Sequence, residues 1–211
     1  MSLLIDVDAE IDRQSLLKHP FYRKWSEGGL TRQNLAGYSL EYFQLVKAVP
    51  SMVTNVASFA APSRMGAIRA NAAEELTHID PWVRFAGSLG VNRSKLEGYP
   101  GAPATTRSVR ALNSLTTSSF EEGVAAMYAY EKQLPEISRS KIDGLKKHYG
   151  MEGGDATNYF ELHEEADVRH AAVWRSFLTR TGRSDETIMT AVKGSLRAQN
   201  ELLDSVMDSH C

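Results

Sequence analysis

Apolar residues recur at intervals of three and four along most of the chain, which is the spacing of amphipathic helices. Strict alternation of apolar and polar residues, which marks a β-hairpin, is nearly absent. A first helix is predicted over residues 8–18, and it ends at His19-Pro20 because the residue before a proline avoids the helical backbone conformation. A short helix over 21–26 follows and stops at Gly28 and Gly29.

Longer helices are predicted for the rest of the chain. Thr31 is the expected N-cap of a long helix with a kink at Pro50, and Pro81 lies inside a helix expected over 64–89. The clearest loop is the stretch GYPGAP, residues 98–103. Four more helices are expected over residues 105–118, 120–149, 155–180 and 185–209. No repeat or linker interrupts this pattern, so we predict an all-α fold in which seven or eight helices form one bundle-like domain over 1–211.

The charge balance narrows the classes of partner. Of the 211 residues 42% are hydrophobic and 24% are charged, and the net charge is -2. This balance argues against a nucleic-acid-binding protein, which carries a basic excess or a basic stripe. One local cluster of basic residues is expected at a solvated helix end, where it complements the helix dipole. Its members are Lys141, Lys146, Lys147 and His148.

Cysteine content and hydropathy bear on the compartment. Cys211 is the only cysteine and the last residue, so neither an internal disulfide nor a cysteine metal site is expected. No apolar run approaches the roughly 20 residues that span a membrane. The first residues, MSLLIDVDAEID, carry acids where a signal peptide carries bases. We therefore expect a cytoplasmic protein with no membrane partner.

The strongest candidate for chemistry is the stretch NYFELHEEADVRHAAVW. His163, Asp167 and His170 fall within about 60° of one another on a helix, so their side chains leave one face together. The apolar residues around them suggest burial, and a buried charged Asp is costly unless a metal or a partner compensates it. Imidazole and carboxylate ligands suit iron, manganese or zinc. The alternative is a solvent-exposed polar face continued by Glu164, Glu165 and Arg169.

Two further stretches could complete such a site. In NAAEELTHIDPW, Glu75 and His78 are three residues apart and Glu74 and His78 are four apart, so either pair can project together. Glu131 follows an apolar run and is a plausible inward carboxylate. The alternatives are a polar helix surface for the first stretch and a surface Glu paired with a Lys for the second. Together the three stretches provide the Glu and His set that a two-metal site in a helical bundle requires.

The chain also resembles a known family. The stretches HPFYRKWSEGGLT, YEKQLPEISRSKIDGLKKHYG and FELHEEADVRHAAVW resemble the heme-oxygenase-like di-metal oxidases. The closest likeness is to their CADD-like branch, which is related to pyrroloquinoline-quinone synthase and thiaminase-II-like proteins. The resemblance runs from about His19 to Arg180. It implies a seven-helix bundle that uses molecular oxygen and a reductant at two iron ions or a mixed iron–manganese pair, with no heme. The resemblance also implies a homodimer.

The resemblance also implies which residues bind metal. By position these are Glu75, His78, Glu131, His163, Asp167 and His170. Many relatives place the first Glu seven residues ahead of its His, where this chain has Asn71, a poor ligand. Other branches use a shorter Glu-x-x-His, which selects Glu75, and Glu74 stays open as an alternative.

The CADD-like branch resembles enzymes that make p-aminobenzoate for folate from their own side chains. By that resemblance Tyr22 is the tyrosine consumed, Tyr38 is a radical-relay tyrosine, and Lys141 donates the amino group. Each copy then turns over at most once. Tyr22 and Tyr38 could equally be packing aromatics, and Lys141 is informative only if it points inward, where burial is otherwise penalised.

Two other functions compete with this hypothesis. A di-metal oxygenase of the same scaffold could act on an external small molecule such as a fatty acid or an amino acid. A binding protein on the same fold would hold no catalytic metal. A thiaminase-like hydrolase is not expected, because that chemistry needs a cysteine nucleophile inside the bundle and Cys211 is the last residue.

Overall fold

The computed structural model describes residues 3–179 and 184–211, and within these ranges the chain is helical, with no β-strand. Twelve α-helices and two short 3-10 helices follow one another. The α-helices are α1 (Leu3–Arg13), α2 (Pro20–Glu27), α3 (Arg32–Val46), α4 (Val49–Ser58), α5 (Pro62–Thr77), α6 (Ile79–Ser88), α7 (Arg93–Gly98), α8 (Pro103–Thr116), α9 (Phe120–Glu131), α10 (Leu134–Tyr149), α11 (Asn158–Leu178) and α12 (Asp185–His210). The 3-10 helices are η1 (Leu16–Lys18) and η2 (Gly154–Ala156).

Local signals in the sequence set several helix ends. Thr31 caps α3 as predicted: its hydroxyl accepts from the Asn34 backbone N–H, and the Asn34 side chain accepts from the Thr31 N–H. Gly28 and Gly150 end α2 and α10 in the left-handed conformation, with φ of 73° and 62°. The predicted loop at 98–103 lies between α7 and α8. The end predicted at Arg180 lies outside the described residues.

Three long helices are interrupted, and each interruption has the same cause. The helix before the break ends four residues ahead of a proline, in the pairs Val46 and Pro50, Thr77 and Pro81, and Glu131 and Pro135. A proline has no N–H to donate to that residue's carbonyl, and its ring clashes with it. The kink predicted at Pro50 is confirmed, whereas the breaks inside the predicted helices 64–89 and 120–149 were not foreseen. Counting each interrupted pair as one helix leaves nine rather than seven.

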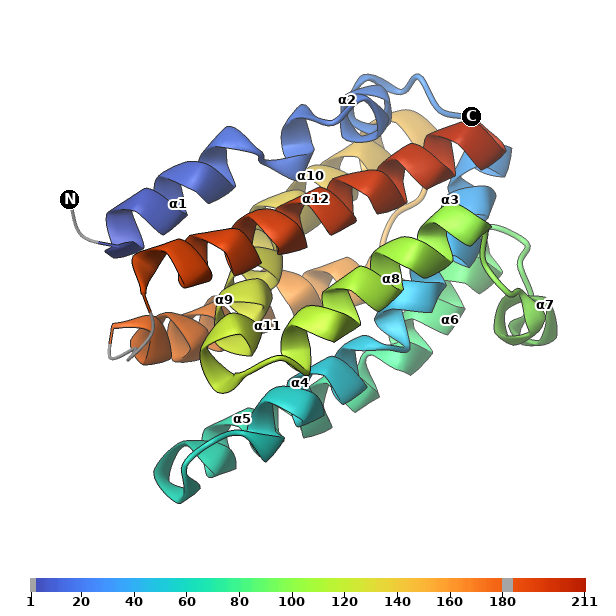
Figure 1. Ribbon diagram of the computed structural model, residues 1–211. Helices are drawn as coiled ribbons and strands as arrows, with labels where there is room; N and C mark the ends of the chain where they lie inside the picture. Colours follow the sequence, from blue (N-terminus) through green and yellow to red (C-terminus); the bar gives the residue numbers. More distant parts are fainter. Residues whose placement is uncertain (1–2, 180–183) are drawn as a thin grey trace.

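The helices pack around a core that α12 crosses from end to end (Figure 1). α12 contacts α8, α9, α3 and α1, while α4 lies beside α5. α11 contacts α5, α6, α9 and α10, and α10 also contacts α2. The segments that carry the candidate residues therefore meet around α11. None of the described helices combines the length and the apolar character that crossing a membrane requires.

A close contact between α2 and α10 gives a test of this packing. A Cβ added at Gly144 would lie 2.6 Å from Cδ1 of Trp25, whose ring is buried and donates from Nε1 to the Lys141 carbonyl. We expect Gly144→Ala to destabilise the protein by about 1–3 kcal/mol, because overpacking forces ring or backbone to move. Gly66→Ala is the control, since its Cβ meets nothing within 4 Å and should stabilise α5 by roughly 0.5–1 kcal/mol. Chemical denaturation measures both; equal shifts would contradict the close contact.

Candidate metal centre

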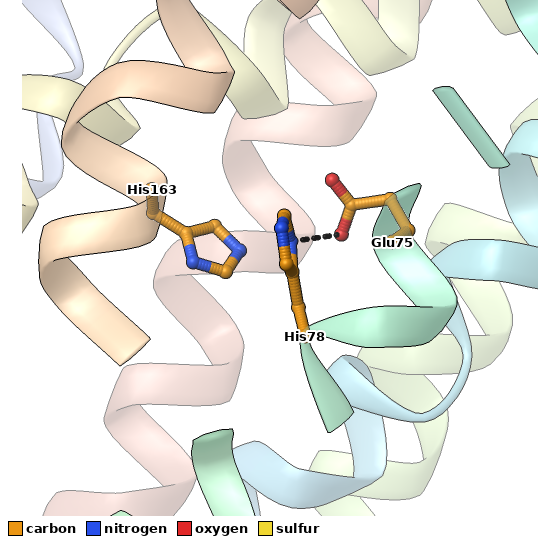
Figure 2. Close-up of side chains that lie close together, drawn as sticks. All are labelled: Glu75, His78 and His163. Atoms are coloured by element: carbon orange, nitrogen blue, oxygen red, sulfur yellow. Dashed lines mark ion pairs between the residues drawn. The ribbon is translucent and has the colours of Figure 1, made fainter. Parts of the chain in front are cut away.

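Glu75 and His78 are brought inward at the break between α5 and α6. Glu75 lies in the last turn of α5, and His78 is the residue between the two helices. Both are buried, and Nδ1 of His78 lies 3.5 Å from Oε2 of Glu75. His163 extends from α11 toward His78, so that His78 lies between His163 and Glu75 (Figure 2). The two imidazole rings are 4.4 Å apart between centroids.

α11 presents His163, Asp167 and His170 on one buried face, as their spacing predicted. The exposed-face alternative is wrong for these three residues, whereas their neighbours Glu165 and Arg169 are exposed. The same stripe continues in both directions at helical spacing. Tyr159 lies four residues before His163 and Trp174 four residues after His170, and both are buried.

Glu131 reaches the same place from the last residue of α9. It is buried, its Oε2 accepts a hydrogen bond of 2.6 Å from Nε1 of Trp174, and the same oxygen lies 3.9 Å from Nδ1 of His170. The interpretation of Glu131 as a surface residue paired with a lysine is therefore wrong. The sequence indicated that Trp174 is buried but did not predict that it donates to this carboxylate.

These side chains form two groups that share one carboxylate. Ligand atoms of Glu75, His78 and His163 lie within 4.8 Å of one another, and so do those of Glu75, Asp167 and His170. Several buried polar atoms of the two groups and of the adjacent Glu131 have no hydrogen-bond partner, which is unusual because an unpaired buried carboxylate is costly. They are Nδ1 of His78, Oε1 of Glu131, both carboxylate oxygens of Asp167, and Nδ1 of His170. Unpartnered oxygen and nitrogen atoms facing one another fit a pair of metal ions.

The protonation of the carboxylates follows from this crowding. Burial and the charge of Glu75 raise the pKa of Glu131 to about 8. Burial and the charges of Glu75 and Glu131 raise the pKa of Asp167 well above its usual range. Burial acts the same way on Glu75, but its contacts with His170 and His78 outweigh it and hold its pKa well below the usual range. Without metal, the charge of Glu75 is thus balanced mainly by His170, and burial favours the neutral forms of Glu131 and Asp167.

The surroundings also shift the pKa values of His163 and His170, in opposite directions. Burial lowers the pKa of His163 to about 4, so this ring is neutral near pH 7. Burial also opposes the charging of His170, but the surrounding carboxylates, Glu75 first among them, raise its pKa to about 9.

The structure distinguishes Glu74 from Glu75. Glu75 is the inward carboxylate, whereas the side chain of Glu74 is 36% exposed and reaches His170 from the outer side. Asn71, one turn before Glu75, is buried on the inward side, and neither its amide oxygen nor its nitrogen has a hydrogen-bond partner. The geometry favours Glu75 as the shared carboxylate.

Lys141 lies inside the bundle, although the charge pattern placed it in an exposed basic cluster. That prediction is confirmed for Lys146, Lys147 and His148, which are exposed in the last turn of α10, and is wrong for Lys141, which is 3% exposed. Nζ of Lys141 donates a 2.7 Å hydrogen bond to Oη of Tyr38. It also lies 5.0–5.2 Å from the centroids of four aromatic rings. These rings, which we call the aromatic cage, belong to Tyr22, Tyr38, Tyr42 and Phe160.

Aromatic contacts join the cage to the histidines. Tyr159 lies against His163, with ring centroids 4.1 Å apart, and its own ring meets Trp82 edge-on at 4.6 Å. Trp82 in turn stacks on Tyr42 at 5.1 Å. The path from imidazole to cage is therefore filled by rings, which exclude water. Trp82 and Tyr159 were not singled out in the sequence, because an aromatic residue at helical spacing is typical of any core.

Replacing Glu131 with an uncharged amide should change the pH dependence of stability in metal-free protein. Folding raises the pKa of Glu131 from about 4.5 to about 8, so its contribution to the free energy of unfolding is fully present below pH 4.5 and is lost as the pH rises from 4.5 to 8. Glu131→Gln removes this loss, so the variant should become more stable relative to the wild type as the pH rises across that window. Urea denaturation of chelator-treated protein at pH 5 and pH 8 measures the difference. If the stability of the wild type and that of the variant change equally with pH, the pKa of Glu131 is not raised on folding.

Comparison with known proteins identifies a family, a curated relative and two solved structures. The profile of a family described as "Iron-containing redox enzyme" matches residues 38–200. The 4-aminobenzoate synthase of Chlamydia muridarum is 33% identical over an alignment that covers 100% of this chain and 94% of that protein. Among solved structures, a domain with a heme oxygenase-like fold from Shewanella denitrificans has a TM-score of 0.82 at 18% identity, covering 98% of this chain and 90% of that one. A CADD-like protein from Nostoc punctiforme has a TM-score of 0.78 at 14% identity, covering 98% and 94%.

Proposed function

The chain belongs to the heme-oxygenase-like family of iron-containing redox enzymes, and from this membership we propose that it makes 4-aminobenzoate from its own Tyr22 and Lys141 at a di-metal centre. The resemblance and the all-α heme-oxygenase-like fold predicted from the sequence are confirmed. The proposal extends the activity named for the C. muridarum relative to this chain. It treats residues 1–211 as one domain and involves no heme.

The chemistry of the product matches the two side chains. In 4-aminobenzoate, which is p-aminobenzoate, an amino group occupies the position where tyrosine has its phenolic oxygen. A carboxylate occupies the position where tyrosine has Cβ. One tyrosine ring with its Cβ and one amine nitrogen therefore supply all the carbon and nitrogen atoms. Nζ of Lys141 lies 5.0 Å from the centroid of the Tyr22 ring, so the nitrogen donor is already beside the ring.

The observation that carries the proposal is the burial of Lys141 in the aromatic cage. No carboxylate pairs with this amine in the described part of the chain, and its one hydrogen bond goes to Oη of Tyr38. Burial lowers the pKa of Lys141 to about 7, so a large fraction carries the free electron pair that bond formation to a ring carbon requires. Tyr38 fixes the direction of Nζ, and the remaining rings keep water from the amine.

The proposed ligands are the six residues that the sequence suggested. Glu75 is shared by the two groups, His78 and His163 complete one, and Asp167 and His170 complete the other. Glu131 adds a further carboxylate beside His170. Two iron ions, or an iron–manganese pair, bound there would supply the oxidising power, with dioxygen as oxidant and an external reductant as electron source. The protein then holds Tyr22 and Lys141 within the same dry interior.

The test uses the full chain loaded with iron. After dioxygen and a reductant are added, we expect at most one molecule of 4-aminobenzoate per chain. The intact mass should fall by the ring and Cβ of Tyr22 and by the Nζ nitrogen of Lys141, and peptide mapping should place the losses at these two residues. Two bound metal ions with an unchanged chain mass would overturn the self-sacrificing function and favour an external substrate instead.

A further inference from the structure

His170 is the one histidine of the centre whose ring contacts carboxylates on both sides. Its Nε2 lies 3.0 Å from Oε2 of Glu74 and forms a hydrogen bond with it. Its Nδ1 points into the centre, where it lies 3.2 Å from Oε1 of Glu75, with further carboxylate oxygens at 3.8 and 3.9 Å, and forms no hydrogen bond. The ring therefore bridges an outer carboxylate and an inner group of carboxylates.

Glu74 is itself held in place from outside. Its second oxygen, Oε1, accepts a 2.6 Å hydrogen bond from Nη2 of Arg169, the residue that precedes His170 on α11. Glu74 comes from α5, so its carboxylate also bridges two of the helices that carry proposed ligands, α5 and α11. Because successive residues on a helix point about 100° apart, Glu75 faces the centre while Glu74 lies behind the histidine ring.

His163 shows the opposite arrangement. Its Nδ1 donates a 2.8 Å hydrogen bond to the backbone carbonyl of Tyr159, which leaves Nε2 for the centre. The partner behind His163 is thus a neutral carbonyl, whereas the partner behind His170 is a carboxylate. A histidine ligand normally donates its other N–H to such a partner, which fixes the tautomer and makes the ligand nitrogen more basic.

We propose that Glu74 is a positioning residue of the metal centre: its carboxylate holds the proton of His170 on Nε2, so that Nδ1 is the ligand atom. This inference rests on the proposed metal centre and adds to it a residue that binds no metal. It also assigns opposite ligand nitrogens to His170 and His163. Arg169 neutralises the exposed side of Glu74 and is dispensable for the tautomer.

Metal binding, measured without any reaction, tests the role of Glu74. We would titrate metal-free protein with Mn²⁺ and with Co²⁺ and determine the number of sites and their affinities. Glu74→Ala should weaken one of the two sites by about 10–100-fold. Glu74→Gln should lose less, because its amide oxygen still accepts from Nε2. Glu164→Ala is the matched control: its side chain is 34% exposed and pairs with Arg139 at 2.9 Å, as Glu74 pairs with Arg169, and both sites should keep wild-type affinity.

A second variant separates positioning from simple bridging of α5 and α11. Arg169→Met removes one end of the bridge but leaves the hydrogen bond from Glu74 to His170, so its metal affinities should match the wild type. If Arg169→Met weakens the same site as much as Glu74→Ala does, the role is structural and the proposal is overturned. ¹⁵N NMR of zinc-loaded protein gives an independent readout, in which the Nε2 of His170 should carry the proton; zinc bound at Nε2 would also overturn the proposal.

The failure of this inference differs from the failure of the proposed function. If the wild type binds two ions and Glu74→Ala binds both with wild-type affinity, Glu74 has no positioning role, and the metal centre itself is still supported. If the wild type binds no ion, the metal centre and the inference are both wrong.

Discussion

Replacing Tyr22 with phenylalanine is expected to reduce the yield of 4-aminobenzoate from about one molecule per chain to none, with metal binding unchanged. Phenylalanine keeps the ring and its packing in the aromatic cage but removes the phenol that makes the ring oxidisable and marks the position where nitrogen enters. The Tyr22 hydroxyl has no hydrogen-bond partner in the structure, so its removal breaks no contact that holds the fold. Quantification of the product and the intact mass of the chain measure the effect.

Tyr128→Phe is the matched control for this experiment. Tyr128 is as buried as Tyr22, with 2% of each exposed, but its hydroxyl donates to Asp8 on α1, away from the cage. This variant should make product at the wild-type yield. Lys141→Arg in turn replaces the amine with a guanidinium, which stays charged and offers no transferable primary amine, so it should also yield none. Product formation by Tyr22→Phe would show that the substrate comes from outside the chain.

Glu75→Ala is expected to have the largest effect on metal content, because Glu75 belongs to both ligand groups. His78→Ala removes a ligand from one group only and should leave the other ion bound. The loss of affinity for Glu75→Ala should exceed the factor of about 100 that is typical of changes behind a ligand, and should affect both ions. Metal analysis after gel filtration, together with titration of Mn²⁺ into metal-free protein, distinguishes the two variants.

Glu75→Ala tests the shared-carboxylate arrangement only if the variant still folds. Glu75 is the carboxylate that keeps its charge beside His78 and His170, so its removal leaves the raised pKa of His170 without its main support. If Glu75→Ala folds and retains both ions, the shared-carboxylate arrangement is wrong. If it fails to fold, Glu75→Gln preserves the shape of the side chain and makes the same measurement available.

The sequence predicted the inward face of α11 correctly because that face depends only on spacing within one helix. His163, Asp167 and His170 share a helical face whatever the rest of the fold does. The choice between Glu74 and Glu75 could not be made in this way, since either can pair with His78 on an isolated helix. It depends on where α11 crosses α5, and this is set by long-range packing. The charge pattern likewise did not predict the inward direction of Lys141, because a lysine five residues before Lys146 and six before Lys147 looks like part of their exposed cluster.

The break between α9 and α10 was missed for a different reason. The apolar period continues through residues 120–149, and Pro135 was given no weight against it. The backbone effect of a proline falls one turn upstream, at Glu131, and not at the proline itself. A period of apolar residues reports which side of a helix is buried, but it does not report whether the axis is continuous.

Two of the three interrupting prolines, Pro81 and Pro135, therefore bear on the position of metal ligands although they bind no metal themselves. A proline side chain offers no atom to a metal ion, yet Pro81 stops α5 just after Glu75 and Pro135 stops α9 at Glu131. At both places a helix ends inside the bundle, and the carboxylate lies in its last turn rather than in the middle of a continuous helix. In a relative that lacked these prolines, the same acids would lie on uninterrupted helices, and their side chains would point in different directions. In this chain, two of the proposed ligand carboxylates therefore lie within six residues before a proline that ends their helix.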